Sequence, residues 1–158
     1  MNARPKRPSA DITRKTILLA AKEIFLEKGF NGAYIKDIAK LADVNTNLIF
    51  HHFSNKATLW NTVKDFLLGE DIPMPHYNKS SAKAFFKSVL DYRFNLYAKH
   101  PEFAALIKWE ALFKHETALI STKFYSPLHW LPIIEDLQQS GKIISSIDAK
   151  QIMLFIIF

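Results

Sequence analysis

Polar side chains occupy the start and one side of the segment 45–53, NTNLIFHHF. The hydroxyl of Thr46 and the amide of Asn47 are groups that can hydrogen-bond to base edges in the major groove of DNA. Phe50 and His51 follow four residues later, which places each on the same side of a helix as its predecessor. Asn45 is a residue type preferred at a helix N-cap. The spacing therefore predicts a short helix that turns these side chains outward, towards a partner.

The preceding segment, residues 35–42, predicts the scaffold for this helix. Ile49 and Phe53 of the second helix point inward, and small Ala39 of the first permits a close crossing. Between the helices, Asp43 tolerates the left-handed backbone of a tight turn, and Val44 fills the angle. The first helix has one apolar face at i, i+3, i+4, i+7 spacing, formed by Ile35, Ile38, Ala39 and Ala42. This layout predicts a helix-turn-helix, which places its second helix in the DNA major groove.

The composition limits the class of protein. Of 158 residues, 49% are hydrophobic, 4 are glycine and none is cysteine, which favours a helical globular fold and excludes disulfides and Cys-based zinc sites. Residues 1–68 carry 11 Lys/Arg against 6 Asp/Glu, whereas residues 69–158 carry 10 against 9. A basic N-terminal part fits a polyanionic partner, although a modest excess is also compatible with solubility alone. With no secretory signal and no membrane-length apolar run, we expect a soluble cytoplasmic protein.

Helical periodicity continues on both sides of the motif. A first helix, capped by Asp11 or Thr13, is predicted to end before Gly29. A fourth helix, capped by Asn55, is predicted to reach Leu68. The two helices enclose the motif and complete a domain large enough for its own core.

The second half of the chain is predicted to be helical and rich in aromatic residues, after a segment interrupted by glycine and proline. Its helices are predicted from Ser80 or Ser81 to Lys99, from Pro101, over 117–125, over 128–139 and from Asp148. The predicted organisation is a flexible basic arm (1–10), a helix-turn-helix DNA-binding domain (11–68), a linker (69–79) and a helical effector-binding and dimerisation domain (80–158). The arm can alternatively touch DNA phosphates or the minor groove.

The last predicted helix is apolar nearly all round where the sequence stops, and such a helix is normally buried by partners. Three interpretations stay open. A second chain covers the helix, the sequence is truncated at this end, or the true C-terminus lies here.

Four segments resemble the DNA-binding domain of TetR-family transcriptional regulators in residues and in spacing: TRKTILLAAKEIFLEKGF, IKDIAKLADVN, LIFHHF and SNKATLW. They cover about a third of the chain, and the rest resembles the family in architecture only. The resemblance implies an all-α fold in which an N-terminal three-helix helix-turn-helix domain is linked through a fourth helix to a helical ligand-binding and dimerisation domain. It also implies a homodimeric repressor that binds a palindromic operator in double-stranded DNA and is released by a small-molecule effector.

The resemblance implies DNA contacts at matching positions. Thr46 and Asn47 stand where base-reading residues lie, and Phe50 stands where a Tyr is usual. The residues expected at DNA are Tyr34, Lys36, Asn45, Thr46, Asn47, Phe50, His51, His52 and Lys56. The sequence departs from the family pattern at Ala33, in place of a Thr, and at Asp43, in place of a turn Gly, which puts a negative charge near DNA.

Amphipathic aromatic residues of the second half are candidates for an effector site, because they bring a polar atom to an apolar wall. They are Tyr92, Tyr97, Trp109, Tyr125, His129 and Trp130, and a plain core role is the alternative for each. Neighbouring helical residues point about 100° apart, so His51 and His52 do not suit one metal ion. No Gly-rich phosphate loop or nucleophile elbow occurs, so we expect no cofactor, no metal and no catalysis.

Two function classes stay open at this stage. The first is a sequence-specific regulator, most simply a repressor released by a small, largely apolar or aromatic ligand. The second is a ligand-binding or protein-interaction module with a degenerate helix-turn-helix that does not read DNA, which the residues at Ala33, Asp43 and Phe50 favour.

Overall fold

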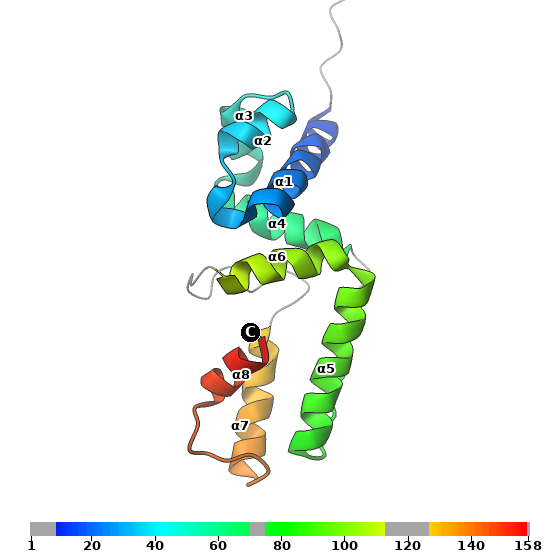
Figure 1. Ribbon diagram of the computed structural model, residues 1–158, viewed down its shortest axis with the longest axis vertical. Coiled ribbons are helices and arrows are strands. Elements are labelled where there is room, and N and C mark those ends of the chain that lie inside the picture. Colours follow the sequence, from blue (N-terminus) through cyan, green and yellow to red (C-terminus); the bar gives the residue numbers. More distant parts are fainter. Residues whose placement is uncertain (1–8, 70–74, 113–126, 158) are drawn as a thin grey trace, which may run out of the picture. The chain divides into compact units, whose positions relative to one another are not determined.

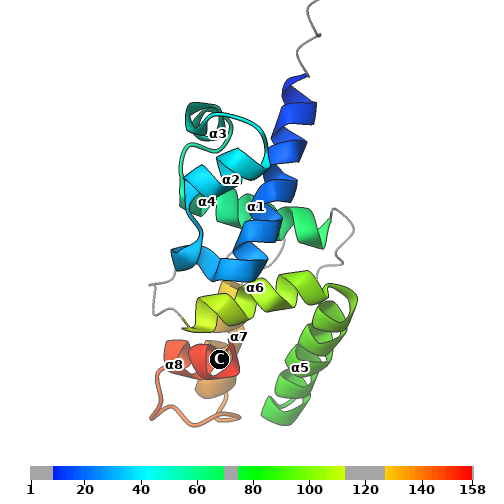
Figure 2. The same cartoon turned by 45° about the horizontal axis from the view of Figure 1, so that its top comes forward.

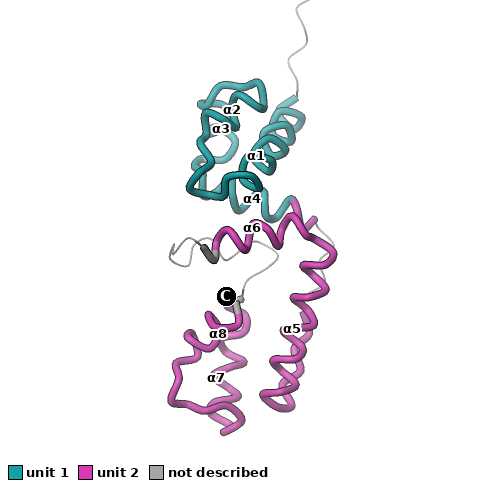
Figure 3. Tube along the Cα trace, in the orientation of Figure 1, with its two compact units in different colours: residues 1–66 teal, residues 67–158 magenta. Residues whose placement is uncertain are grey.

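The computed structural model describes residues 9–69, 75–112 and 127–157, and these residues form helices with no strand, which confirms the all-α class. The chain divides into two compact units, residues 1–66 and 67–158 (Figure 3). The first holds α1 (Ala10–Gly32), α2 (Ile35–Leu41), α3 (Thr46–Phe53) and most of α4 (Lys56–Leu68). The second holds α5 (Ala82–Lys99), α6 (Pro101–Leu112), a 3₁₀ turn (Pro127–Trp130), α7 (Leu131–Gln139) and α8 (Ala149–Ile157), as labelled in Figure 1.

Helix α1 differs from its prediction at both ends. The cap at Asp11 or Thr13 was wrong, because the Ser9 hydroxyl accepts from the Ile12 N–H at 3.4 Å and the helix begins at Ala10. Asp11 instead lies in the first turn, where the helix dipole favours a carboxylate. The predicted stop at Gly29 is a kink: with φ 65° and ψ −176°, Gly29 leaves the helical region, and one further turn follows.

The first unit is built around the apolar side of α1. Phe25 is fully buried, and its ring packs edge-on against Trp60 of α4 with 4.8 Å between centroids and a 75° interplanar angle. The buried residues of α1 are Ile17, Leu18, Ala20, Ala21, Ile24, Phe25 and Gly29. Figure 2 shows α2 and α3 packed beside α1 in this unit. The burial of α1 and α4 therefore provides the base on which the helix-turn-helix rests.

Two apolar clusters lie among the described residues of the second unit. In Figure 1, α7 and α8 lie side by side, and the larger cluster joins them to α5. Its buried members are Phe85, Val89, Trp130, Ile133, Ile134, Leu137, Ala149 and Met153. The smaller cluster comprises Leu68, Leu96, Phe103 and Ile107. Of the two predicted caps for α5, Ser81 is the one observed, accepting from the Ala84 N–H at 3.2 Å.

The segment before α5 and the helix α8 differ in how far their aromatic side chains are buried. Tyr77, in the segment interpreted as a linker, is half-buried and packs against the larger cluster. Helix α8 begins after Asp148, whose side chain accepts from the Lys150 N–H at 2.8 Å, and it leaves Phe155 88% exposed. The predicted helix over 117–125 and residues 1–8 of the predicted arm lie outside the described residues. No helix in the described part of the chain is long and apolar enough to cross a membrane.

Replacing Phe25 by Ala should lower the free energy of unfolding by about 3–5 kcal/mol, because it removes a fully buried ring and its contact with Trp60. Leu19→Ala, on the exposed side of the same helix at 44% exposure, is the matched control and should cost less than about 1 kcal/mol. Urea denaturation followed by far-UV circular dichroism measures both. Equal losses for the two variants would contradict the assigned core.

Candidate nucleic-acid interface

Helices α2 and α3 are held together by their inner faces. Ile38 and Ala39 of α2 and Ile49 and Phe53 of α3 are all buried. Ala39 is small, so the two helices can approach closely where they cross. Because this inner face is fully used, the remaining sides of α3 are the ones available to a partner.

The turn between the two helices is closed by backbone hydrogen bonds. The Val44 N–H donates to the Ala39 carbonyl at 3.0 Å, and the Asp43 N–H donates to the Lys40 carbonyl at 3.3 Å. This 6→1 and 5→2 pairing is a Schellman ending, which needs a left-handed residue at the position of Asp43. Asp43 has φ 51°, one of two positive φ values at a non-glycine residue in the described chain.

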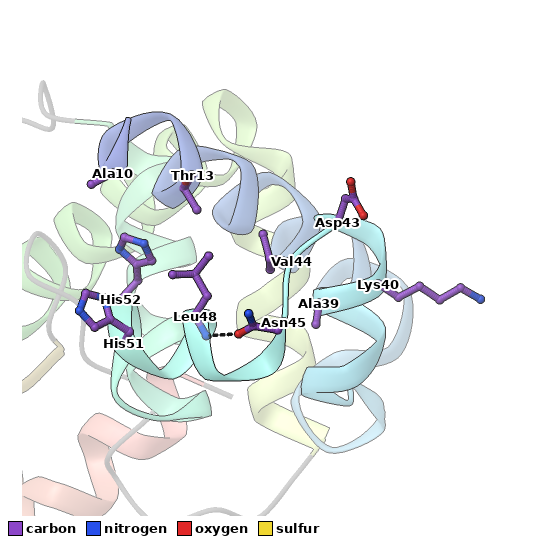
Figure 4. A pocket seen from close by; sticks show the side chains of 10 residues that line it. All are labelled: Ala10, Thr13, Ala39, Lys40, Asp43, Val44, Asn45, Leu48, His51 and His52. Atoms are coloured by element: carbon purple, nitrogen blue, oxygen red, sulfur yellow. Dashed lines mark hydrogen bonds between the residues drawn. The ribbon is translucent and has the colours of Figure 1, made fainter. Parts of the chain in front are cut away.

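Asn45 is the N-cap of α3, as its residue type predicts. Its Oδ1 accepts from the Leu48 N–H at 2.8 Å, the dashed line in Figure 4. The cap fixes where α3 begins and so fixes the direction in which Thr46 and Asn47 project. The cap uses one of the two lone pairs of Oδ1, so the amide NH₂ and the second lone pair of Asn45 are left for another contact.

The residues expected at DNA divide by exposure. Tyr34, Lys36, Asn45, Asn47, Phe50 and His51 are exposed, whereas Thr46, His52 and Lys56 are half-buried. A groove of about 850 Å³ lies between the start of α1, the end of α2 and α3. Its lining, drawn in Figure 4, is Ala10, Thr13, Ala39, Lys40, Asp43, Val44, Asn45, Leu48, His51 and His52. The structure therefore brings Asn45, His51 and His52 to one groove, with the side chains of α1 as its opposite wall.

Two lysines of this unit, Lys36 and Lys56, rest on aromatic rings. The Lys36 Nζ lies 5.3 Å from the Tyr34 ring centroid, and the Lys56 Nζ lies 4.6 Å from that of Phe30. Partial burial lowers the pKa of Lys56 from its ordinary value. A cation over a ring is held by the ring quadrupole, so these positive charges have restricted positions before any partner arrives.

Arg14 is a basic residue of this surface that sequence reasoning missed. It lies on α1, is exposed, and its guanidinium carbon is 5.2 Å from the ring centroid of Phe53, at the end of α3. Thr13, beside it, lines the groove together with His51 and His52. The run TRK in the sequence signals positive charge, but only the tertiary contact shows that it joins the end of α3.

An ion pair ties α2 to α1. Asp37 of α2 and Lys28 of α1 form it, with 3.5 Å between Oδ2 and Nζ.

The two adjacent histidines of α3 contact each other. His51 and His52 stack edge-on with 5.4 Å between ring centroids. Among the described residues, no group of three His, Cys, Asp or Glu side chains could hold a metal ion.

The effector candidates are scattered, with one aromatic cluster among them. Tyr77 contacts both Tyr92 and Trp130 edge-on, at 6.3 Å between centroids in each case. The guanidinium carbon of Arg93 is 5.3 Å from the Tyr97 ring centroid and 6.0 Å from that of Trp130. We call these five residues the aromatic cluster. Sequence reasoning missed the participation of Tyr77 and Arg93, because it depends on the contacts that Trp130 makes with Tyr77 and with Arg93, which are distant from it in the sequence.

The other effector candidates lie elsewhere in the chain. His129 is exposed, Trp109 lies half-buried on α6, and Tyr125 lies outside the described residues.

Within the aromatic cluster, two buried polar atoms lack a hydrogen-bond partner among the described residues, the Tyr92 Oη and the Trp130 Nε1. Burial raises the pKa of both Tyr77 and Tyr92, so both phenols stay protonated at neutral pH. The nearby Trp130 N–H lowers the pKa of Tyr77, an effect smaller than that of burial, although the two groups do not meet hydrogen-bond geometry. Unpaired buried donors carry a desolvation cost that an acceptor on a ligand or a water would remove.

Comparison with known proteins places these features in a family context. The family model described as "Bacterial regulatory proteins, tetR family" matches residues 17–63. The HTH-type transcriptional repressor NicS of Pseudomonas putida is 29% identical over 112 residues, covering 65% of this chain and 50% of NicS. The repressor SCO4008 of Streptomyces coelicolor is 27% identical over 151 residues, covering 93% of this chain and 76% of that protein. The chain thus spans half the length of NicS.

A solved structure shares the fold over most of the described chain. HlyIIR, a hemolysin II transcriptional regulator, superposes with a TM-score of 0.55 at 25% sequence identity. The match covers 94% of this chain and 84% of HlyIIR, so it includes both compact units.

Asn45→Ala should destabilise the first unit by about 1 kcal/mol, because it removes the acceptor for the Leu48 N–H. Asn45→Ser keeps a capping oxygen and should stay within about 0.5 kcal/mol of the unchanged protein. Thermal denaturation by circular dichroism measures the difference. The same loss in both variants would mean that Asn45 stabilises the unit through something other than its cap.

Proposed function

We propose that this chain, which belongs to the TetR family of bacterial regulatory proteins, is a sequence-specific DNA-binding transcriptional regulator. In this proposal it is a repressor that a small, largely apolar or aromatic ligand releases from its operator. The observation that carries the proposal is that one face of α3 is buried while polar and aromatic side chains on its other faces are exposed. Its inner face is buried by Ile49 and Phe53, while Asn47, Phe50 and His51 are exposed on the remaining sides.

Specificity would come from the start of α3 in the major groove. Thr46 and Asn47 follow the Asn45 cap directly, so a helix entering the groove by its N-terminus would present them to base edges. Phe50, 44% exposed, can contact a thymine methyl but has no hydroxyl for a phosphate. Two such helices on a homodimer would fit a palindromic operator.

Affinity would come from the cations around α3. Lys36 and Lys56 are held over aromatic rings, and Arg14 lies over Phe53 at the end of α3. Charges whose positions are already restricted lose less side-chain entropy when they meet phosphates. Binding through phosphates releases counterions, so operator affinity should fall steeply as salt is raised.

Release would start in the aromatic cluster of the second unit. The Tyr92 Oη is an unpaired buried donor, and the Tyr92 ring packs against the smaller apolar cluster and lies 6.3 Å from the Tyr77 ring between centroids. Arg93 donates to the Tyr97 Oη at 2.9 Å and to the Ile156 carbonyl, and so connects α5 to α8. A ligand that hydrogen-bonds to Tyr92 would favour the arrangement of these helices that binds it more tightly. It would therefore raise the population of that arrangement at the expense of the other.

The double variant Thr46→Ala plus Asn47→Ala should lose discrimination between operator and unrelated DNA. Each base contact is worth about 1–3 kcal/mol, so the affinity ratio should fall about 10- to 100-fold or more while non-specific binding persists. Gel shifts of the duplex flanking the protein's own gene, against a shuffled duplex of equal length, measure the ratio at two salt concentrations.

Lys36→Ala is the matched control for this experiment. Lys36 would contact phosphate, so its loss should weaken binding to both duplexes by a similar factor and flatten the salt dependence. Unchanged discrimination in the double variant would show that α3 is not the reading helix. Absence of binding to either duplex by the unchanged protein would support the alternative, a module that does not read DNA.

Tyr92→Phe should leave the stability of the ligand-free protein unchanged or raise it slightly, because it removes a buried hydroxyl that lacks a partner. If that hydroxyl binds the effector, the variant should show a smaller ligand-induced rise in melting temperature than the unchanged protein. A thermal-shift screen of aromatic compounds on both proteins measures this. A marked loss of ligand-free stability would contradict the unpaired hydroxyl.

A further inference from the structure

Asp43 occupies a position where the backbone conformation favours glycine and the helix dipole disfavours a negative charge. Its φ of 51° is a conformation in which the Cβ of an L-residue is crowded, and glycine is the usual residue there. It follows the C-terminal end of α2, where the helix dipole disfavours a negative charge. Its carboxylate is exposed and forms no ion pair or hydrogen bond with any residue that the structure describes. The left-handed conformation tolerates Asp, as it tolerates Asn, but no local contact of this turn stabilises the negative charge.

The position of Asp43 relative to α3 suggests a reason. Asp43 is two residues before the cap Asn45, so their Cα atoms are at most about 7.6 Å apart. Figure 4 shows Asp43 and Lys40 at the end of the groove opposite His51 and His52, beside the start of α3. The major groove of DNA is only about 12 Å wide, so a helix that enters by its start has phosphates on both sides. The Debye length at physiological salt is about 8 Å, so a carboxylate this close to them is not fully screened.

We propose that Asp43 limits the affinity of this protein for DNA by repelling the phosphates that border the start of α3. The inference rests on the proposed function, since it concerns the same surface. It also assigns Asp43 a role different from that of the other acidic residue of the helix pair, because the charge of Asp37 is compensated by Lys28 at 3.5 Å. An uncompensated negative charge lowers affinity for every DNA sequence and keeps the operator complex easier to dissociate.

Asp43→Asn tests the charge alone, because asparagine also tolerates the left-handed conformation. The variant should bind DNA about three- to tenfold more tightly at about 50 mM salt, and the gain should shrink at about 200 mM. The gain should be the same on the operator duplex and on an unrelated duplex, because the repelled groups are phosphates. Fluorescence anisotropy with labelled duplexes measures both.

Two further variants separate charge from backbone conformation and from net charge. Asp43→Gly should bind DNA as tightly as Asp43→Asn and should also melt at a higher temperature, because it relieves the left-handed conformation. Glu27→Gln removes the same charge from α1 at a position 14 residues from Thr13, about 21 Å along the helix axis. It is exposed and should change DNA affinity by less than about twofold.

The binding measurements test the proposed function and the inference about Asp43 separately. If the unchanged protein binds and Asp43→Asn binds no more tightly, the inference about Asp43 fails and the proposed function stands. Loss of discrimination in Asp43→Asn would instead make Asp43 a base-reading residue, for which the amino group of cytosine is the fitting partner. If the unchanged protein prefers no sequence but Asp43→Asn binds every duplex more tightly, the inference holds and the regulator proposal fails. No binding of any variant to DNA at about 50 mM salt would overturn both.

Discussion

The interface depends first on the burial of the inner face of α3. Ile49 and Phe53 are removed from water against α2 and α1, and this fixes the rotation of an eight-residue helix that would not be stable alone. The Asn45 cap fixes its start, and the Schellman turn fixes the angle at which the chain enters it. Every outward side chain of α3 inherits its direction from these contacts, so the exposed surface is defined by the buried one.

Sequence periodicity predicted this scaffold because the buried contacts within one helix pair repeat at helical spacing. Ile38, Ala39, Ile49 and Phe53 could be assigned inward, and Asn45 could be assigned as a cap, from neighbours within four residues. The N-cap of α1 could not be chosen correctly, because Ser, Asp and Thr all occur near the helix start and their cap preferences are similar. The choice of Ser9 depends on where the helix actually begins.

The parts of the site that the sequence did not predict are contacts between distant segments. Arg14 of α1 lies over the ring of Phe53 at the end of α3, and Tyr77 joins the aromatic cluster from a segment that contains glycine and proline. Neither residue has a periodic neighbour that signals the contact. The sequence indicates effector candidates by residue type alone, and residue type does not distinguish the fully buried Trp130 from the exposed His129.

Helix α4 gives the two units a common element. Its start carries Lys56 over Phe30, and Trp60 closes the core beneath α1. Its end, at Leu68, belongs to the smaller cluster of the second unit, and the carbonyl of Leu67 lies 3.1 Å from the Nδ1 of His100. The 13 residues of α4 span about 20 Å along the helix axis. Trp60 and Leu68 therefore lie on one continuous helix, so the core of the first unit and the smaller cluster of the second unit each include side chains from the same backbone segment.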